Sequence, residues 1–89
     1  MIEKEVMIVN KLGLHARAAA KFVTVASGFD SEIHLARNDR RVNGKSIMGV
    51  MMLAANQGTL LELEVDGPDE AATLQALVDL INDRFGEEQ

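Results

Sequence analysis

Hydrophobic and polar residues alternate in several short segments of the chain. Residues 2–9 and 61–65 repeat with a period of two, which is typical of strands with one buried face. Residues 32–36 show the same alternation. A turn at Asn38-Asp39 then leads into a short third strand over residues 40–43. The pattern therefore predicts four strands.

Three further segments favour helices. The alanine-rich stretch from Ala16 to about Ser27 has high helix propensity. Ser46 can cap the amino end of a second helix over residues 47–54. A third helix opens at Gly67-Pro68-Asp69, and its apolar residues recur at helical spacing as far as Phe85. The predicted order of elements is βαββαβα.

The fold class follows from the two faces of the strands. Strands with one apolar and one acidic face indicate an antiparallel sheet that is covered on one side only. All three helices must then pack on the same face, which gives an α/β (α+β) open-faced two-layer sandwich. No linker, repeat or low-complexity tract interrupts the pattern, so residues 1–89 are predicted to form a single domain.

Composition and charge argue against several classes of function. The net charge of −5, from 14 acidic and 9 basic residues, argues against binding to nucleic acid or to an anionic membrane surface. The chain has no cysteine, and His34 has no neighbouring ligand and is predicted to be an exposed structural residue, so we expect no metal or cofactor. The longest apolar run, residues 47–55, is too short to cross a bilayer. With no signal-peptide pattern, we expect a cytoplasmic location.

The most informative chemistry lies in the segment Gly13–Val23. His15 and Arg17 fall where a glycine loop meets the alanine-rich helix. Unpaired first-turn amides and the helix dipole favour an anion there, and Arg17 adds a fork of N–H donors. A neutral imidazole in these cationic surroundings is an available nucleophile, so the arrangement suits a phosphoryl group on His15. A histidine in this place can also be a simple helix cap, and that alternative stays open.

Three motifs at fixed spacing resemble a known family. They are Gly13–Arg17, Val42–Met51, and Gly67–Glu70 followed by an amphipathic helix. Together they are similar to HPr, the histidine-containing phosphocarrier of the bacterial phosphoenolpyruvate-dependent sugar phosphotransferase system. The resemblance extends from Met1 to about Phe85. It implies a phosphoryl carrier that is not an enzyme with its own turnover. We expect a monomer, because no oligomer signal appears and a shuttle must dock face-on with successive partners.

The resemblance also implies roles for single residues. Enzyme I would pass a phosphoryl group to Nδ1 of His15, Arg17 would pair with the phosphate, and the carrier would hand the group to an enzyme IIA. Ser46 matches the family's regulatory serine, the target of an HPr kinase in many bacteria. A phosphate there would add negative charge beside a docking surface. A plain helix cap explains Ser46 equally well.

The family docks its partners on the exposed faces of the first two helices. We expect Ile47, Val50 and Ala54 to face the sheet, although Ile47 also belongs to the expected docking set. Met48 should lie outside, with at least one of Met51 and Met52 in the core. The docking residues that the resemblance implies are Ala16, Ala20, Lys21, Lys45, Ile47, Met48 and Met51.

Two departures from the common family pattern bear on partner choice. Ala18 replaces a proline that many relatives carry, which should loosen the helix entrance slightly. Lysines that relatives place along the docking helices are missing, so electrostatic steering should be weaker. Two other functions remain open: a regulatory carrier of the nitrogen-related branch, and a binding module that uses the methionines of residues 48–52 and Ser46 while His15 is only a cap.

Overall fold

The computed structural model covers residues 1–89 and contains the predicted elements in the predicted order. The four strands are β1 (Ile2–Met7), β2 (Glu32–Arg37), β3 (Arg40–Asn43) and β4 (Leu60–Asp66). The three helices are α1 (Ala16–Ser27), α2 (Ile47–Met52) and α3 (Glu70–Asn82), and a 3₁₀ turn, Arg84–Gly86, follows the last of them. The order βαββαβα is confirmed.

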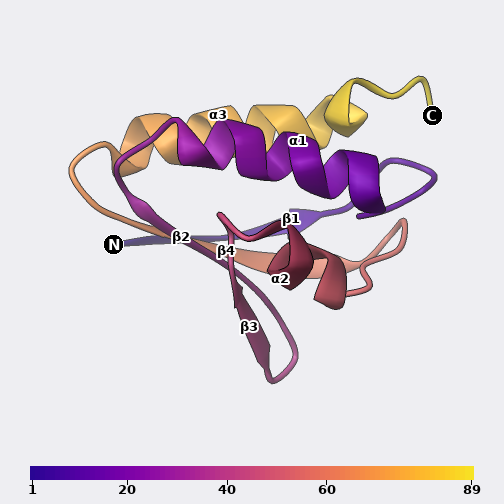
Figure 1. Cartoon of the computed structure of the whole chain (residues 1–89), viewed down its shortest axis with the longest axis horizontal. Helices are drawn as coiled ribbons and strands as arrows, with labels where there is room; N and C mark the ends of the chain where they lie inside the picture. Colours follow the sequence, from indigo (N-terminus) through magenta and orange to yellow (C-terminus); the bar gives the residue numbers. More distant parts are fainter.

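The strands form one sheet in the order β1-β4-β2-β3, and every neighbouring pair is antiparallel. In Figure 1, α1 and α3 lie side by side along the sheet, with α2 packed next to α1. The opposite face of the sheet is open and acidic, with Glu3, Glu5 and Glu62 all exposed. The predicted open-faced sandwich is therefore confirmed.

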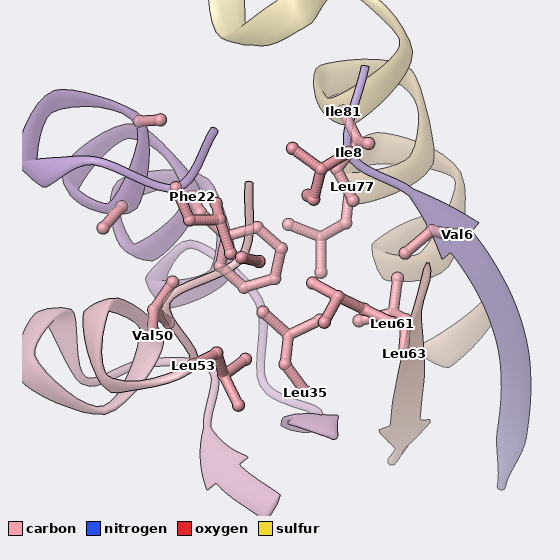
Figure 2. Packing of buried hydrophobic residues seen from close by; sticks show 14 of the residues in the cluster. Val6, Ile8, Phe22, Leu35, Val50, Leu53, Leu61, Leu63, Leu77 and Ile81 are labelled. Carbon is pink, nitrogen blue, oxygen red and sulfur yellow. The ribbon is translucent and has the colours of Figure 1, made fainter. Parts of the chain in front are cut away.

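The core fills the space between the helices and the sheet with 18 buried hydrophobic residues. Figure 2 shows Phe22 of α1, Val50 of α2 and Leu77 of α3 converging over the sheet. Leu35 and Leu61 point up at them from β2 and β4. Each such large side chain, once removed from water, stabilises the fold by about 1.5–3 kcal/mol. The core thus holds all three helices at fixed places on the sheet, and with them the starts of α1 and α2.

Helix α2 is shorter than predicted and turns a different side to the core. It ends at Met52, and Ala54 has a left-handed φ of 50°, so the chain has already left the helix there. Val50 is buried, as predicted, but Ile47 is 43% exposed and Ala54 is exposed too, while Leu53 is buried. The prediction that Ile47 and Ala54 face the sheet is wrong, because it extends helical spacing past the real end.

Methionines cover the outside of α2. Met48 is 71% exposed, Met51 38% and Met52 57%. The prediction that at least one of Met51 and Met52 lies in the core is therefore wrong, since Leu53 takes that place. Three flexible, apolar thioether side chains remain on one exposed surface, which suits contact with partners of different shape.

Two arginines of the β2–β3 hairpin close the carboxyl end of α2. Arg37 Nη1 donates to the carbonyl oxygens of Leu53 (2.9 Å) and Ala54 (3.0 Å). Arg40 Nη1 donates to the carbonyl oxygen of Met52 at 2.7 Å. Carbonyls at a helix end otherwise have no intrahelical partner. These contacts fasten the hairpin to a helix of only six residues.

The first strand and the last helix both end earlier than predicted. The first strand ends at Met7 rather than at residue 9, although the Ile8 amide still donates to Thr59 O at 2.9 Å. The last helix ends at Asn82, so Phe85 is not helical and has a left-handed φ of 55°. Phe85 is nevertheless buried, which draws the C-terminal residues back onto the domain.

Asp69 ties the start of α3 to the segment before β2. Its Oδ1 accepts from the Ser31 hydroxyl, the Ser31 amide (3.0 Å) and the Thr73 hydroxyl (3.2 Å). Its Oδ2 accepts from the Asp30 amide at 2.9 Å. These donors, the Ser31 hydroxyl first among them, lower the pKa of Asp69 to about 2.

The Asp69→Asn variant should lose stability in a pH-dependent way. The folded pKa of about 2 lies below the unfolded value of about 3.9, so the stabilisation is fully present above about pH 4. It is lost as the pH falls from about 4 towards 2. Urea midpoints of wild type and variant should differ most near pH 7 and converge near pH 2. The matched control is Asp39→Asn at an exposed hairpin position, which should leave the urea midpoint close to that of the wild type.

Candidate functional site

A glycine loop delivers His15 to the start of α1. Gly13 has a left-handed φ of 69°, and a Cβ on it would come within 2.4 Å of Ala55 O. The Leu14 amide donates to that same Ala55 oxygen at 2.9 Å, and Asn10 Nδ2 donates to Gly13 O at 2.8 Å. The loop therefore packs against the segment after α2 in a form that only glycine allows.

His15 is the N-cap residue of α1. Its backbone is extended (φ −73°, ψ 178°), and its Nδ1 accepts from the Arg17 amide at 3.3 Å. The side chain is 29% exposed, so the ring is neither buried nor turned away from the helix start. An atom that accepts from an amide carries a lone pair rather than a proton. The cap and the candidate nucleophile are therefore the same nitrogen.

Glu87 is a residue of the site that the sequence pattern did not reveal. Its Oε2 lies 2.5 Å from His15 Nε2, and its Oε1 accepts from Asn10 Nδ2 at 3.0 Å. Burial opposes ionisation of this carboxyl group, but the hydrogen bonds from Asn10 and His15 outweigh it, so the pKa of Glu87 is lowered. The prediction of purely cationic surroundings for His15 is therefore wrong, because the Glu87 carboxylate lies against Nε2, on the side of the ring away from the Arg17 amide.

The chain after α3 is held over this site at several points. Phe85 is buried, and Lys21 Nζ donates to its carbonyl oxygen at 2.6 Å. Further along, the Lys11 amide donates to Gln89 O at 2.9 Å. Lys21, expected to dock partners, therefore also holds the C-terminal segment. The open hollow that results is lined by residues from both ends of the chain, including Lys11, Leu12, His15, Ala16, Arg17, Lys21, Gly86, Glu87, Glu88 and Gln89.

Most of the predicted residues of α1 gather at this hollow. Arg17 and Ala16 are exposed beside His15, and Ala20 is half-buried one turn further along. Ala18, two residues before Ala20, is fully buried. Arg17 is exposed and lines the same hollow as His15, so its guanidinium adds positive charge to a site that already has the amides of a helix start.

Ser46 begins α2 and does not line the hollow around His15. Its Oγ accepts from the Gly49 amide at 3.1 Å, which is the N-cap contact predicted from the sequence. The neighbouring Lys45 Nζ donates to Phe29 O at 2.7 Å, so this predicted docking lysine is also tied to the backbone. Ser46 is half-buried and directly precedes the exposed Ile47.

His34 lies on the open face of the sheet, opposite Asn43 on β3 and Glu64 on β4. It is half-buried by these neighbours rather than fully exposed as predicted, because a central strand has a partner on each side. It has no contact with the hollow that contains His15.

Comparison with known proteins identifies the family. The family model described as "PTS HPr component phosphorylation site" matches residues 2–83. The chain belongs to the HPr family. It is 61% identical over 87 residues to the phosphocarrier protein HPr of Neisseria meningitidis, with 98% of each chain covered. The HPr of Cupriavidus necator is 54% identical over 87 residues, again with 98% of each chain covered.

Solved structures agree with this membership. An HPr from Thermoanaerobacter tengcongensis superposes with a TM-score of 0.95 at 49% identity, and all of each chain is covered. The HPr of Bacillus anthracis gives a TM-score of 0.86 at 38% identity, covering 90% of this chain and 95% of its own.

As a member of this family, the chain is a phosphocarrier of the sugar phosphotransferase system and not a catalytic enzyme. It works with phosphotransferase-system enzymes such as Enzyme I and enzyme IIA. None of its helices combines the length and hydrophobicity that crossing a membrane would need.

Proposed function

We propose that Nδ1 of His15 accepts the phosphoryl group from phosphorylated Enzyme I and passes it on to enzyme IIA proteins of sugar uptake. The observation that carries the proposal is the contact between His15 Nδ1 and the Arg17 amide at the start of α1. His15 Nδ1 in this position has a lone pair and faces the amino end of α1, and the ring is partly open to solvent. In each transfer the phosphorus–nitrogen bond of the donor breaks and one to the acceptor nitrogen forms.

The residues around the ring suit the product of this transfer. A phosphoryl group on Nδ1 would bring negative oxygens to the amide of Arg17, where the helix dipole favours an anion. The Arg17 guanidinium could pair with two of those oxygens in a bidentate contact. Arg17 is accordingly assigned the role of phosphate partner, and no metal or cofactor takes part in the step.

The exposed sides of α1 and α2 form the proposed docking surface for partners. It combines apolar side chains, led by Met48 at 71% exposure, with the charge of Arg17. A carrier that meets successive partners face-on works most simply as a monomer in the cytoplasm. Size-exclusion chromatography at micromolar concentration should give the mass of one 9.7 kDa chain. The full set of residues proposed for docking is Ala16, Ala20, Lys21, Lys45, Ile47, Met48 and Met51.

The test is direct phosphorylation. The protein is incubated with Enzyme I and phosphoenolpyruvate labelled with ³²P, and it should gain label that is stable to alkali but lost in acid. Parallel reactions with Enzyme I of the sugar branch and of the nitrogen branch compare the two rates. Faster labelling by the sugar enzyme supports the proposal. Absence of label would leave a binding module as the better description.

We also propose Ser46 as a phosphorylation site for an HPr kinase. The added charge of about −1.5 to −2 would lie at the start of α2, beside the exposed Ile47 and Met48. Its expected effect is repulsion of an acidic partner rather than unfolding, because a helix start tolerates negative charge.

Two variants separate the cap from the charge. Ser46→Ala removes the acceptor for the Gly49 amide and should cost about 1 kcal/mol of unfolding free energy, with phosphorylation by Enzyme I little changed. Ser46→Asp keeps a cap acceptor, so its stability should match the wild type while transfer slows. Equal transfer rates in Ser46→Asp and wild type would contradict the regulatory role.

A further inference from the structure

The C-terminal segment brings a carboxylate against the phosphoryl-accepting ring. We propose that Glu87 is a positioning residue for phosphoryl transfer, which holds the Nε2–H of His15 and offsets the charge of the phosphorylated ring. The inference rests on the proposed role of His15. It assigns a function to the C-terminal segment, in which Glu87 lies 72 residues after His15 in the sequence.

Two contacts on the ring define a single tautomer. An ionised carboxylate can only accept, so the short contact with Glu87 Oε2 places the imidazole proton on Nε2. A backbone amide can only donate, so the contact from the Arg17 N–H leaves Nδ1 without a proton. Both contacts therefore select the neutral form in which Nδ1 is the free nucleophile. Without Glu87 the opposite tautomer would compete and would have no lone pair on Nδ1.

The carboxylate acts again once the group has been transferred. The donor's phosphorus–nitrogen bond breaks as the Nδ1–phosphorus bond forms, and no proton has to leave Nδ1. Nε2 keeps its proton, so the ring carries a formal positive charge between the phosphoryl group and Glu87. Because Glu87 is only 11% exposed, solvent screens this attraction less than it would at an open surface. The negative charge of Glu87 thus favours the phosphorylated ring.

Glu87 is held in place independently of His15. Its Oε1 accepts from Asn10 Nδ2, and the same amide group donates to Gly13 O in the loop that delivers the ring. Asn10 itself is completely buried. The backbone on either side is fixed by the buried Phe85 and by the bond from the Lys11 amide to Gln89 O. The carboxylate and the ring are therefore positioned by one connected set of contacts.

The experiment compares two variants of Glu87 with the same changes at its exposed neighbour Glu88. Glu87→Ala removes the acceptor, whereas Glu87→Gln keeps an acceptor oxygen and removes only the charge. ¹⁵N NMR of the neutral His15 ring reads the tautomer directly. Labelling by Enzyme I gives the rate of phosphorylation, and the lifetime of the label after Enzyme I is removed reports on the phosphorylated ring.

The wild type should show a proton on Nε2 and a free Nδ1. Glu87→Ala should show a mixture of tautomers, and Glu87→Gln should keep the wild-type form. Phosphorylation should slow about tenfold in Glu87→Ala, because the ring loses a hydrogen bond to a charged group. Glu87→Gln keeps a hydrogen bond but loses the negative charge that favours the phosphorylated ring, so it should also be slower than the wild type. Glu88→Ala and Glu88→Gln should match the wild type in tautomer and rate. Protection of the Lys11 amide against hydrogen exchange shows whether the C-terminal segment is still docked.

The wild-type tautomer and rate in Glu87→Ala would overturn the proposal, whether or not the segment stays docked. Slow transfer in Glu87→Ala with an unchanged tautomer and a wild-type rate in Glu87→Gln would overturn it as well, since the effect would then be only structural. Failure of the proposed function looks different. In that case the wild type itself gains no label, while the NMR measurement still reports which nitrogen carries the proton.

Discussion

Replacing His15 with alanine should abolish phosphorylation by Enzyme I completely. The variant lacks the nitrogen that accepts the phosphoryl group, and no other nucleophile lines the hollow in a comparable position at a helix start. Label from [³²P]phosphoenolpyruvate, counted after gel separation, should therefore fall to background. The matched control is His34→Ala, which removes the other imidazole of the chain from the open face of the sheet. This control should be labelled at the wild-type rate.

Stability must be measured alongside, because His15 also caps α1 through its contact with the Arg17 amide. Loss of the cap should cost about 1 kcal/mol, which leaves a domain of this kind folded. A folded His15→Ala variant that still gains acid-labile label would mean that another residue is the acceptor. Loss of label in His34→Ala instead would mean that phosphorylation depends on the open face of the sheet and not on the hollow that contains His15.

The Phe22→Ala variant should lose about 3–5 kcal/mol of unfolding free energy. Phe22 is fully buried between α1, α2 and the sheet, so its removal leaves a cavity that the surrounding side chains cannot close (Figure 2). Small domains have only about 5–15 kcal/mol in total, so this single change removes much of the margin. Urea unfolding followed by far-UV circular dichroism measures the loss. The folded fraction of the variant should bind partners poorly as well, because Phe22 supports both docking helices.

Phe29→Ala provides the comparison at the same residue type. Phe29 is only half-buried, after the end of α1, and its truncation should cost clearly less than that of Phe22. Equal losses in the two variants would show that burial in the core does not determine the effect.

The sequence predicts the sheet and the helix starts well because both have local signals. A two-residue period marks the face of a strand without reference to the rest of the chain, and β1, β2 and β4 are found where it occurs. The short strand β3 follows the predicted turn at Asn38-Asp39. His15 and Ser46 could be placed because each directly precedes a helix and caps it. The candidate nucleophile and the candidate regulatory serine were accessible to sequence reasoning for that reason.

The two main errors have no local signal. The buried side of α2 depends on where a six-residue helix stops, and that point is set by the left-handed turn at Ala54 and by Arg37 from a distant hairpin. Glu87 stands among other polar residues at the end of the chain, where nothing distinguishes it from Glu88. Its contact with His15 is a product of the tertiary fold, because it depends on Phe85 being drawn into the core.

The attachment of Gln89 to Lys11 has a practical consequence for anyone who labels or immobilises this carrier. A dye, tag or surface linker joined to the last residue would hang over the mouth of the reactive hollow and compete with incoming proteins. The amino end lies at the opposite end of the molecule (Figure 1), where Met1 pairs with Glu70. Handles for binding measurements therefore belong at residue 1.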